Sequence, residues 1–394
     1  MPGSATHSTS TVSSQTDSHR HHFGQLDSLR GLAALAVVIH HAVILTVTGN
    51  DFWHNHAQPH QWWEWVAFRS PVMLLDQGIS AVYLFFVLSG FVLALPWFSG
   101  RHQTYPTFII RRVCRIYIPY LASMLFSVLL LLAVGHPVIS NVSTFYASIW
   151  HSALDVSTLG RTLAVDTDNS LNFPTWTIAW ELRIALIFPI LLAPVVLLKR
   201  NGLLLSLVVM LVACIGLRVA GPVAAEFGRV AYAYIALFIM GAALASIVDR
   251  IQTFEPGSTR STTALLGLGA LLLFPVWSTK PLVAFIPLGA GSMLVMIAAL
   301  RTGWFSSFLQ RATPRWLGKI SFSVYLIHVP IITAFLAITQ EWLPVPIALI
   351  SGVILSFAAA PIFYRLVEYP AQQLGRRLSR PKPSAKILDR AVTV

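Results

Sequence analysis

The chain has 394 residues, of which 56% are hydrophobic and only 11% are charged, and its mean hydropathy is +0.70. Soluble proteins carry about 25% charged residues, so this composition excludes a soluble globular protein and predicts an integral membrane protein. The formal net charge of +12 would suit a nucleic-acid-binding protein, but the positions of the basic residues favour a role in membrane topology.

Both ends of the chain are polar and the middle is apolar. Residues 1–25 are rich in Ser, Thr and His, and we expect a disordered cytoplasmic tail there. Residues 26–372 form the predicted transmembrane domain, and residues 373–394 a basic cytoplasmic tail. The two cysteines are far apart in the sequence and imply no disulfide framework.

The apolar region divides into ten candidate spans, since a helix needs about 20 apolar residues to cross a bilayer. We therefore predict an all-α polytopic fold with about ten transmembrane helices and both termini in the cytoplasm. This orientation places most of the 27 Lys and Arg residues on the cytoplasmic side, as membrane proteins do. The predicted spans are 29–48, 79–98, 116–135, 176–198, 202–220, 229–248, 262–278, 281–300, 318–338 and 343–366.

The first span places two histidines within the apolar stretch "LDSLRGLAALAVVIHHAVIL". From Arg30 to His41 is eleven steps, or about 20° beyond three full helical turns, so the two side chains share a face about 16 Å apart. His41 then lies near the membrane midplane, where an ionisable group usually faces a cavity. Two alternatives stay open: both histidines bond structurally to neighbouring helices, or His40 meets the ligand because the helix is distorted.

Basic residues precede the third predicted span in "FIIRRVCRIYIPY". Arg112 and Arg115 are three residues apart and share a helix face. Positive-inside anchoring accounts for these residues without a function. Alternatively, they join Arg30 in holding an anionic ligand, because arginine suits bidentate phosphate binding.

The fourth span contains Glu181, which needs a partner on another helix because an unpaired carboxylate in lipid is costly. His41 is a candidate partner, and a structural ion pair is the alternative. In the ninth span, His328 either lines the same cavity as His41 or bridges two helices. We expect Glu368, at the cytoplasmic edge of the tenth span, to pair structurally with an arginine.

The two largest predicted outer loops are 49–78 and 136–175. The first is rich in tryptophan, which suits either an aromatic belt at the membrane interface or a stacking surface for a sugar-like acceptor. The sequence has no glycine-rich phosphate loop, no His or Cys residues at the spacing of metal ligands and no GxSxG elbow. It therefore does not support a nucleotide hydrolase or a metalloprotease.

Five motifs in order resemble those of the acyltransferase 3 family of integral membrane O-acyltransferases. They are "LRGLAALAVVIHHA", with ten residues between the family's Arg and His, "LFFVLSGFVL", "RRVCRI", "WTIAWE" and "SFSVYLIH". The resemblance covers about residues 25–375. In the fourth motif, Thr177 stands where many members have Ser, and Trp180 and Arg183 fit only some members, so no substrate is carried over.

The resemblance implies that the membrane domain transfers an acyl group, often acetyl, from cytoplasmic acyl-CoA to an acceptor hydroxyl outside or at the membrane. A carbohydrate is the expected acceptor, and no metal or nucleic acid is implied. We expect Arg30, Arg112 and Arg115 to hold the CoA phosphates. The expected catalytic residues are His41, Glu181 and His328, with direct transfer and a covalent relay both open.

Two further expectations follow from the resemblance. The chain has no room for the soluble hydrolase-like domain of some members, so it should act alone or pass the acyl group to a partner. A bacterial chain would lie in the plasma membrane. The main rival is a transporter or flippase for a glycan or acylated small molecule, because polar residues at the midplane also mark transport paths.

Overall fold

The computed structural model describes residues 23–100, 104–198, 222–253, 258–274 and 281–379. Every regular element in these residues is a helix, apart from one isolated antiparallel bridge between Thr46 and Val142. The predicted all-α class is therefore confirmed. Among the described residues, six helical segments are long and apolar enough to span a membrane, and three shorter apolar helices accompany them.

The six long segments are Gly24–Ile44, Gly78–Phe98, Tyr105–Val134, Phe173–Ala193, Ala312–Thr339 and Val345–Leu378. The shorter ones are Ala231–Ser246, Thr259–Leu273 and Phe285–Leu300. The predicted span 202–220 lies outside the described residues, as do both chain ends. The number of ten spans and the cytoplasmic location of the termini stay predictions.

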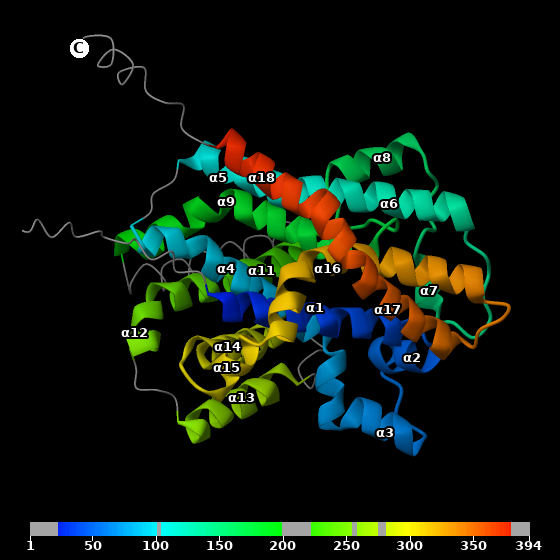
Figure 1. Ribbon diagram of the computed structural model, residues 1–394, viewed down its shortest axis with the longest axis horizontal. Coiled ribbons are helices and arrows are strands. Elements are labelled where there is room, and N and C mark those ends of the chain that lie inside the picture. Colours follow the sequence, from blue (N-terminus) through cyan, green and yellow to red (C-terminus); the bar gives the residue numbers. More distant parts are fainter. Residues whose placement is uncertain (1–22, 101–103, 199–221, 254–257, 275–280, 380–394) are drawn as a thin grey trace, which may run out of the picture.

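The first half of the described fold contains α1 (Gly24–Ile44), α2 (Val47–Asn55), α3 (Trp62–Arg69), η1 (Pro71–Asp76), α4 (Gly78–Phe98), α5 (Tyr105–Arg112), η2 (Val113–Tyr117), α6 (Ile118–Val134), α7 (Thr144–Ser148), α8 (Val156–Leu163), η3 (Phe173–Thr175) and α9 (Trp176–Leu198). The second half contains α11 (Pro222–Ser246), α12 (Val248–Thr253), α13 (Thr259–Leu273), α14 (Pro281–Leu300), α15 (Trp304–Leu309), α16 (Ala312–Thr339), α17 (Val345–Phe363), η5 (Tyr364–Glu368) and α18 (Tyr369–Leu378). Figure 1 shows α2, α3 and α7 near one end of the helix bundle, and α5 and α12 near the other.

The helices α1 and α16 pack side by side at the centre of the fold (Figure 1). Their backbones meet at Gly31 and Gly318, where a Cβ atom added to Gly31 would overlap the backbone of α16. Ten positions further along each helix, the side chains of His41 and His328 meet. The two helices therefore run parallel in a constant register, and the close glycine contact fixes the height at which the histidines face each other.

This register predicts that an added methyl group at Gly31 destabilises the bundle. We expect Gly31→Ala to lower the free energy of unfolding by about 1–3 kcal/mol, because the backbone of α16 cannot move aside as a flexible side chain would. Gly24→Ala is the matched control on the same helix, since its Cβ would meet nothing within 4 Å. Thermal unfolding of the purified variants in detergent measures the difference, and equal melting temperatures would contradict this account of the packing.

A second close contact joins α4 to α11. A Cβ on Gly90 would overlap the carbonyl of Phe238, and a Cβ on Gly241 would overlap the carbonyl of Val87. Gly78, at the other end of α4, lies against the ring of His40. Small residues let helices approach closely in membrane proteins. In the motif "LFFVLSGFVL" of the second predicted span, Gly90 thus serves helix packing, whereas its neighbour Ser89 points to the pocket described below.

The segment between α6 and α9 does not form the simple outer loop predicted for residues 136–175. It returns along α6: Trp150 Nε1 donates to Ser127 Oγ (2.8 Å), and the hydroxyl of Tyr117 donates to the carbonyl of Leu163 (2.9 Å). Tyr117 and Ser127 are about 15 Å apart along a helix axis. The polar side chains of α6 supply hydrogen bonds that let this segment enter the bundle.

As a result, α9 begins inside the bundle rather than at its outer surface. Asn172 Nδ2, just before η3, donates to the carbonyl of Leu326 in the middle of α16 (2.8 Å). Residues early in α9 therefore lie deeper than a count from the outer surface predicts. This displacement decides where Glu181 points.

Candidate active site

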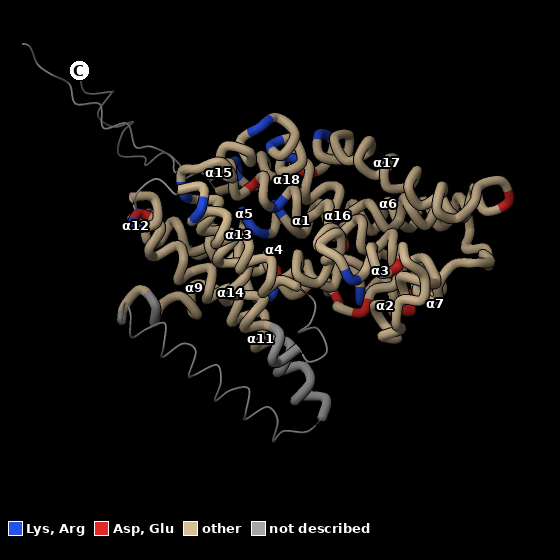
Figure 2. Tube along the Cα trace, turned by 90° about the horizontal axis from the view of Figure 1, so that it is seen from below, with Lys and Arg blue, Asp and Glu red and all other residues tan. Residues whose placement is uncertain are grey.

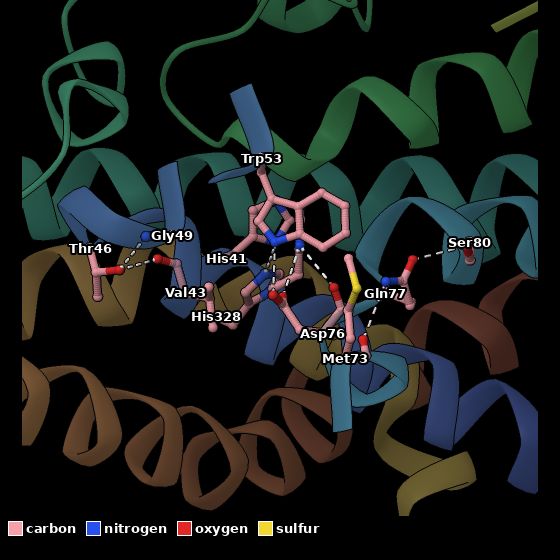
Figure 3. Close-up of polar contacts among 11 residues, drawn as sticks. His41, Val43, Thr46, Gly49, Trp53, Met73, Asp76, Gln77, Ser80 and His328 are labelled. Atoms are coloured by element: carbon pink, nitrogen blue, oxygen red, sulfur yellow. Dashed lines mark hydrogen bonds and ion pairs between the residues drawn. The ribbon is translucent and has the colours of Figure 1, made fainter. Parts of the chain in front are cut away.

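His41 and His328 form a hydrogen-bonded pair between α1 and α16. His41 Nδ1 lies 3.0 Å from His328 Nε2 (Figure 3). On its other side, His328 Nδ1 lies 3.0 Å from the carbonyl of Val324. A carbonyl only accepts hydrogen bonds, so His328 carries its proton on Nδ1 and its Nε2 accepts from His41. This arrangement leaves Nε2 of His41 with a free lone pair, as a general base requires.

His41 is the more exposed member of the pair. His328 is 0% exposed and His41 is 7% exposed. The rings of Phe145 and Phe173 flank His41, with centroids 6.3 and 5.9 Å away. Two aromatic rings and a second imidazole therefore surround His41 and fix the orientation of its ring.

His40 points to a different cluster, as the helical geometry of the sequence predicts. Its Nδ1 lies 2.9 Å from Asp76 Oδ1, and Trp53 Nε1 donates to Asp76 Oδ2 at 2.8 Å (Figure 3). The buried carboxylate thus ties α1 to α2 and η1. Sequence reasoning did not single out Asp76, although a lone acid directly before the apolar second span was a usable signal.

The predicted arginines converge on a cavity, here called the inner pocket. Its wall combines three cations and one carboxylate with hydroxyl groups and apolar side chains. Its lining residues include Arg30, Arg112, Arg115, Ser89, Glu181, Ser321, Thr177 and Tyr325, together with Val82, Phe85, Phe86, Val92, Ile116, Ile178 and Phe322. The structure therefore brings together residues from α1, α4, α5, η2, α9 and α16.

Glu181 belongs to the inner pocket and not to the histidine pair. Its Oε1 accepts a hydrogen bond from Ser89 Oγ (3.0 Å) and lies 4.0 Å from Arg112 NH1. The prediction that Glu181 pairs with His41 is therefore wrong. The physical reason is that the segment between α6 and α9 enters the bundle, so that α9 begins beside the middle of α16 and Glu181 lies near Arg112.

A larger space, here called the vestibule, adjoins the inner pocket. The two spaces share Arg30, Val92, Arg115, Ser321 and Phe322. Arg315 and Lys319 add positive charge to the vestibule, and Trp316 and Tyr364 add aromatic surface. Figure 2 shows Lys and Arg gathered around α5, α15 and α18, at this end of the bundle.

Glu368 also lines the vestibule, but its predicted pairing with an arginine is not observed. Its carboxylate accepts hydrogen bonds from Ser323 Oγ (2.6 Å) and Gln372 Nε2 (3.0 Å). These neutral partners satisfy the buried carboxylate, and Arg30 in the vestibule pairs with Asp27 instead (NH1 to Oδ1, 3.3 Å). Sequence reasoning did not identify Ser323 and Gln372 as its partners.

The inner end of the pocket approaches the histidine pair. Tyr325 and Thr177 line that end, and the ring of Tyr325 lies 6.0 Å from the ring of His328. His328 follows Tyr325 by three residues, or about 4.5 Å along the helix. A continuous series of residues thus runs from the basic vestibule, past the arginines, to within one turn of the histidines.

The other side of His41 faces the elements near α2 and α7. Phe145 lies between His41 and His54, and its ring centroid is 6.4 Å from that of His54. Burial is the main cause that lowers the pKa of His54, which keeps this imidazole neutral at pH 7. In contrast, Trp62, Trp63 and Trp65 are exposed on α3 and lie apart from His41. Within the described residues, no three His, Cys, Asp or Glu side chains gather as a metal site.

Comparison with known proteins gives a consistent result. The family model for the acyltransferase domain of the acyltransferase 3 type matches residues 23–365. The chain is 24% identical to peptidoglycan O-acetyltransferase OatA of Listeria monocytogenes, and the match covers 90% of this chain and 57% of that protein. It is 23% identical to O-acetyltransferase PaAT-1 of Phomopsis amygdali, with coverages of 90% and 84%. It is 25% identical to acyltransferase MdmB of Streptomyces mycarofaciens, with coverages of 80% and 85%. No solved structure shows significant similarity.

Proposed function

The chain belongs to the acyltransferase 3 family, and from this premise we propose that it transfers an acyl group, acetyl first among them, from acyl-CoA to a hydroxyl group of an acceptor. The acceptor is a carbohydrate on the extracytoplasmic side or at the membrane. Two of the relatives are named O-acetyltransferases, which supports both the acetyl group and the oxygen acceptor. The chain acts as a multi-pass membrane protein, in the plasma membrane of a bacterial source.

The observation that carries this proposal is the adjacency of the basic vestibule, the inner pocket and the histidine pair: the two spaces share lining residues, and Tyr325 lines the pocket and packs against His328. The phosphates of acyl-CoA need cations, and arginine binds them through two parallel hydrogen bonds. Arg30 and Arg115 line both spaces, and Arg112 lines the pocket alone. The phosphates therefore bind at the arginines, and the thioester extends along the apolar pocket wall toward Tyr325.

In the proposed step, Nε2 of His41 removes the proton from the acceptor hydroxyl. The oxygen attacks the thioester carbonyl carbon, a C–O bond forms and the C–S bond breaks. The departing CoA sulfur then takes the proton from His41, so atoms and charge balance. His328 holds His41 in the tautomer that this step requires. A covalent relay through His41 uses the same geometry.

Glu181 has a positioning role in this scheme. Its carboxylate lies beside Arg112 and binds Ser89, so it holds the guanidinium of Arg112 at the pocket wall. Before donor binding, the carboxylate also offsets part of the positive charge of the three arginines. The acceptor approaches from the side of α2 and α7, where aromatic rings surround His41.

The test uses purified full-length protein in detergent with acetyl-CoA, and it measures the release of the free CoA thiol. We expect wild-type protein to release CoA and to release it faster when oligosaccharides with free hydroxyl groups are added. Transfer of radiolabelled acetyl to the oligosaccharide would identify the product. If wild type releases no CoA with acyl-CoA of any chain length, while proteoliposomes take up a labelled glycan, the transporter alternative is correct.

A further inference from the structure

The inner end of the pocket is closed by a cluster of hydroxyl groups that the proposed step does not use. Tyr325 OH and Thr177 Oγ1 are 2.6 Å apart. The carbonyl of Pro174 is 3.0 Å from the hydroxyl of Tyr325 and 3.1 Å from that of Thr177. Both side chains line the pocket, yet each is less than one-tenth exposed. The hydroxyls therefore lie at the position that the thioester end of the donor would reach.

This cluster has fewer hydroxyl protons than hydrogen-bonding contacts. Two hydroxyl protons serve three close contacts, so at any moment one contact has no hydrogen of its own. Thr177 can donate either to Pro174 or to Tyr325, and its hydroxyl can thus satisfy the acceptor capacity of the phenol oxygen. The phenol proton is then free to turn to a new acceptor without leaving a buried donor unpaired. In a chain of hydroxyls, donation by Thr177 also makes the phenol a stronger donor.

We propose that Tyr325, supported by Thr177, donates a hydrogen bond to the carbonyl oxygen of the acyl group during transfer. This inference rests on the proposed function. When the acceptor oxygen attacks, the C=O electron pair moves to the carbonyl oxygen, and the phenol O–H stabilises that oxyanion. When the C–S bond breaks, the pair returns to C=O and the phenol keeps its proton. Donors fixed in a low-dielectric site are effective at such positions.

The location favours this role over simple packing. Tyr325 lies between the arginines proposed to bind phosphate and the histidine pair that contains the proposed base, because it lines the pocket and contacts His328. The helix η3 and the start of α9 bring Pro174 and Thr177 to the same point from the opposite side. Thr333, on the same helix, is equally buried but has no hydrogen-bond partner in the described residues, and it does not line the inner pocket.

The experiment compares the kinetics of acetyl-CoA turnover in wild type, Tyr325→Phe, Thr177→Val and Thr177→Ser, with Thr333→Val as the control. We expect Tyr325→Phe to lower kcat by about 10²–10³-fold, the range for loss of one oxyanion donor, while KM and acetyl-CoA binding change little. Thr177→Val should lower kcat less, Thr177→Ser should restore it, and Thr333→Val should leave it unchanged.

Several outcomes overturn the inference. An unchanged kcat in Tyr325→Phe, or a rise in KM alone, shows that the phenol only lines the pocket. If Tyr325→Phe does not fold, the Thr177 variants decide, because equal kcat values for the Val and Ser variants remove the proposed support. These results leave the proposed function intact when wild type turns over acetyl-CoA. Failure of wild type itself, with any acyl-CoA, overturns the proposed function and this inference together.

Discussion

Replacing His41 with alanine is expected to reduce acyl-CoA turnover by roughly 10²- to 10⁴-fold, the contribution usual for a general base. His41 is the more exposed member of the histidine pair, and its Nε2 makes no hydrogen bond within the described residues. The loss should appear in kcat, because the phosphates of the donor bind at the arginines and not at His41. The measurement is the release of free CoA from acetyl-CoA by purified protein.

Two neighbouring histidines serve as controls for this prediction. His328→Ala should reduce kcat less than His41→Ala, because it removes the group that orients the base and leaves the base in place. His40→Ala should lower the melting temperature, since it takes one partner from the buried carboxylate of Asp76. The folded fraction of His40→Ala should stay active. A His41→Ala variant as active as wild type would refute the assignment of the base.

Arg112→Ala is expected to raise the KM for acetyl-CoA by about 10- to 100-fold, since a hydrogen bond to a charged group contributes about 1.5–3 kcal/mol. Arg112 is buried in the wall of the inner pocket. Once its side chain is removed, solvent does not supply another cation at that position. Arg112→Lys should recover part of the affinity, because an ammonium group keeps the charge but lacks the planar fork.

Arg111→Ala is the matched control, because Arg111 lies next to Arg112 on α5 but donates from Nε to Ser379 Oγ (2.7 Å) and does not line the inner pocket. Its KM should equal that of wild type. Combining Arg112→Ala with Glu181→Gln measures the coupling between the two side chains, which contact each other in the pocket. Equal KM values for Arg112→Ala and Arg111→Ala would mean that the phosphates bind elsewhere.

Much of the fold could be predicted from the sequence, because membrane-spanning helices can be recognised by their length and their apolar composition. The helical period also separated His41 from His40 correctly: the two rings bond to different partners, His328 and Asp76. The gathering of Arg30, Arg112 and Arg115 around one space was predicted from charge and helix position, and the inner pocket contains all three. Their roles in binding and catalysis stay predictions until measured.

The partner of Glu181 could not be predicted in the same way. The predicted position of Glu181 assumed that α9 begins at the outer end of the bundle. In the structure, the segment between α6 and α9 enters the bundle through hydrogen bonds to η2, α6 and α16. Those bonds join residues 23 to 154 positions apart in the sequence. Neither hydropathy nor periodicity reports such long-range contacts, and the same limit hid the vestibule and the Asp76 cluster.

The measurement that tests the central claim most directly is a reversible block of the passage between vestibule and inner pocket. Ser321 lines both spaces, so Ser321→Cys, in a background with Cys114→Ser and Cys214→Ser, places one thiol in the proposed path of the donor. Ser246→Cys on α11 is the control, since Ser246 is exposed and lines neither space.

A bulky thiosulfonate reagent should stop CoA release by the Ser321→Cys protein, and a reducing agent should restore it. Acetyl-CoA should slow the modification, and the Ser246→Cys protein should keep its activity throughout. If the Ser321→Cys protein, fully modified, turns over acetyl-CoA at the unmodified rate, the donor does not pass between the vestibule and the histidine pair, and the proposed active site is wrong.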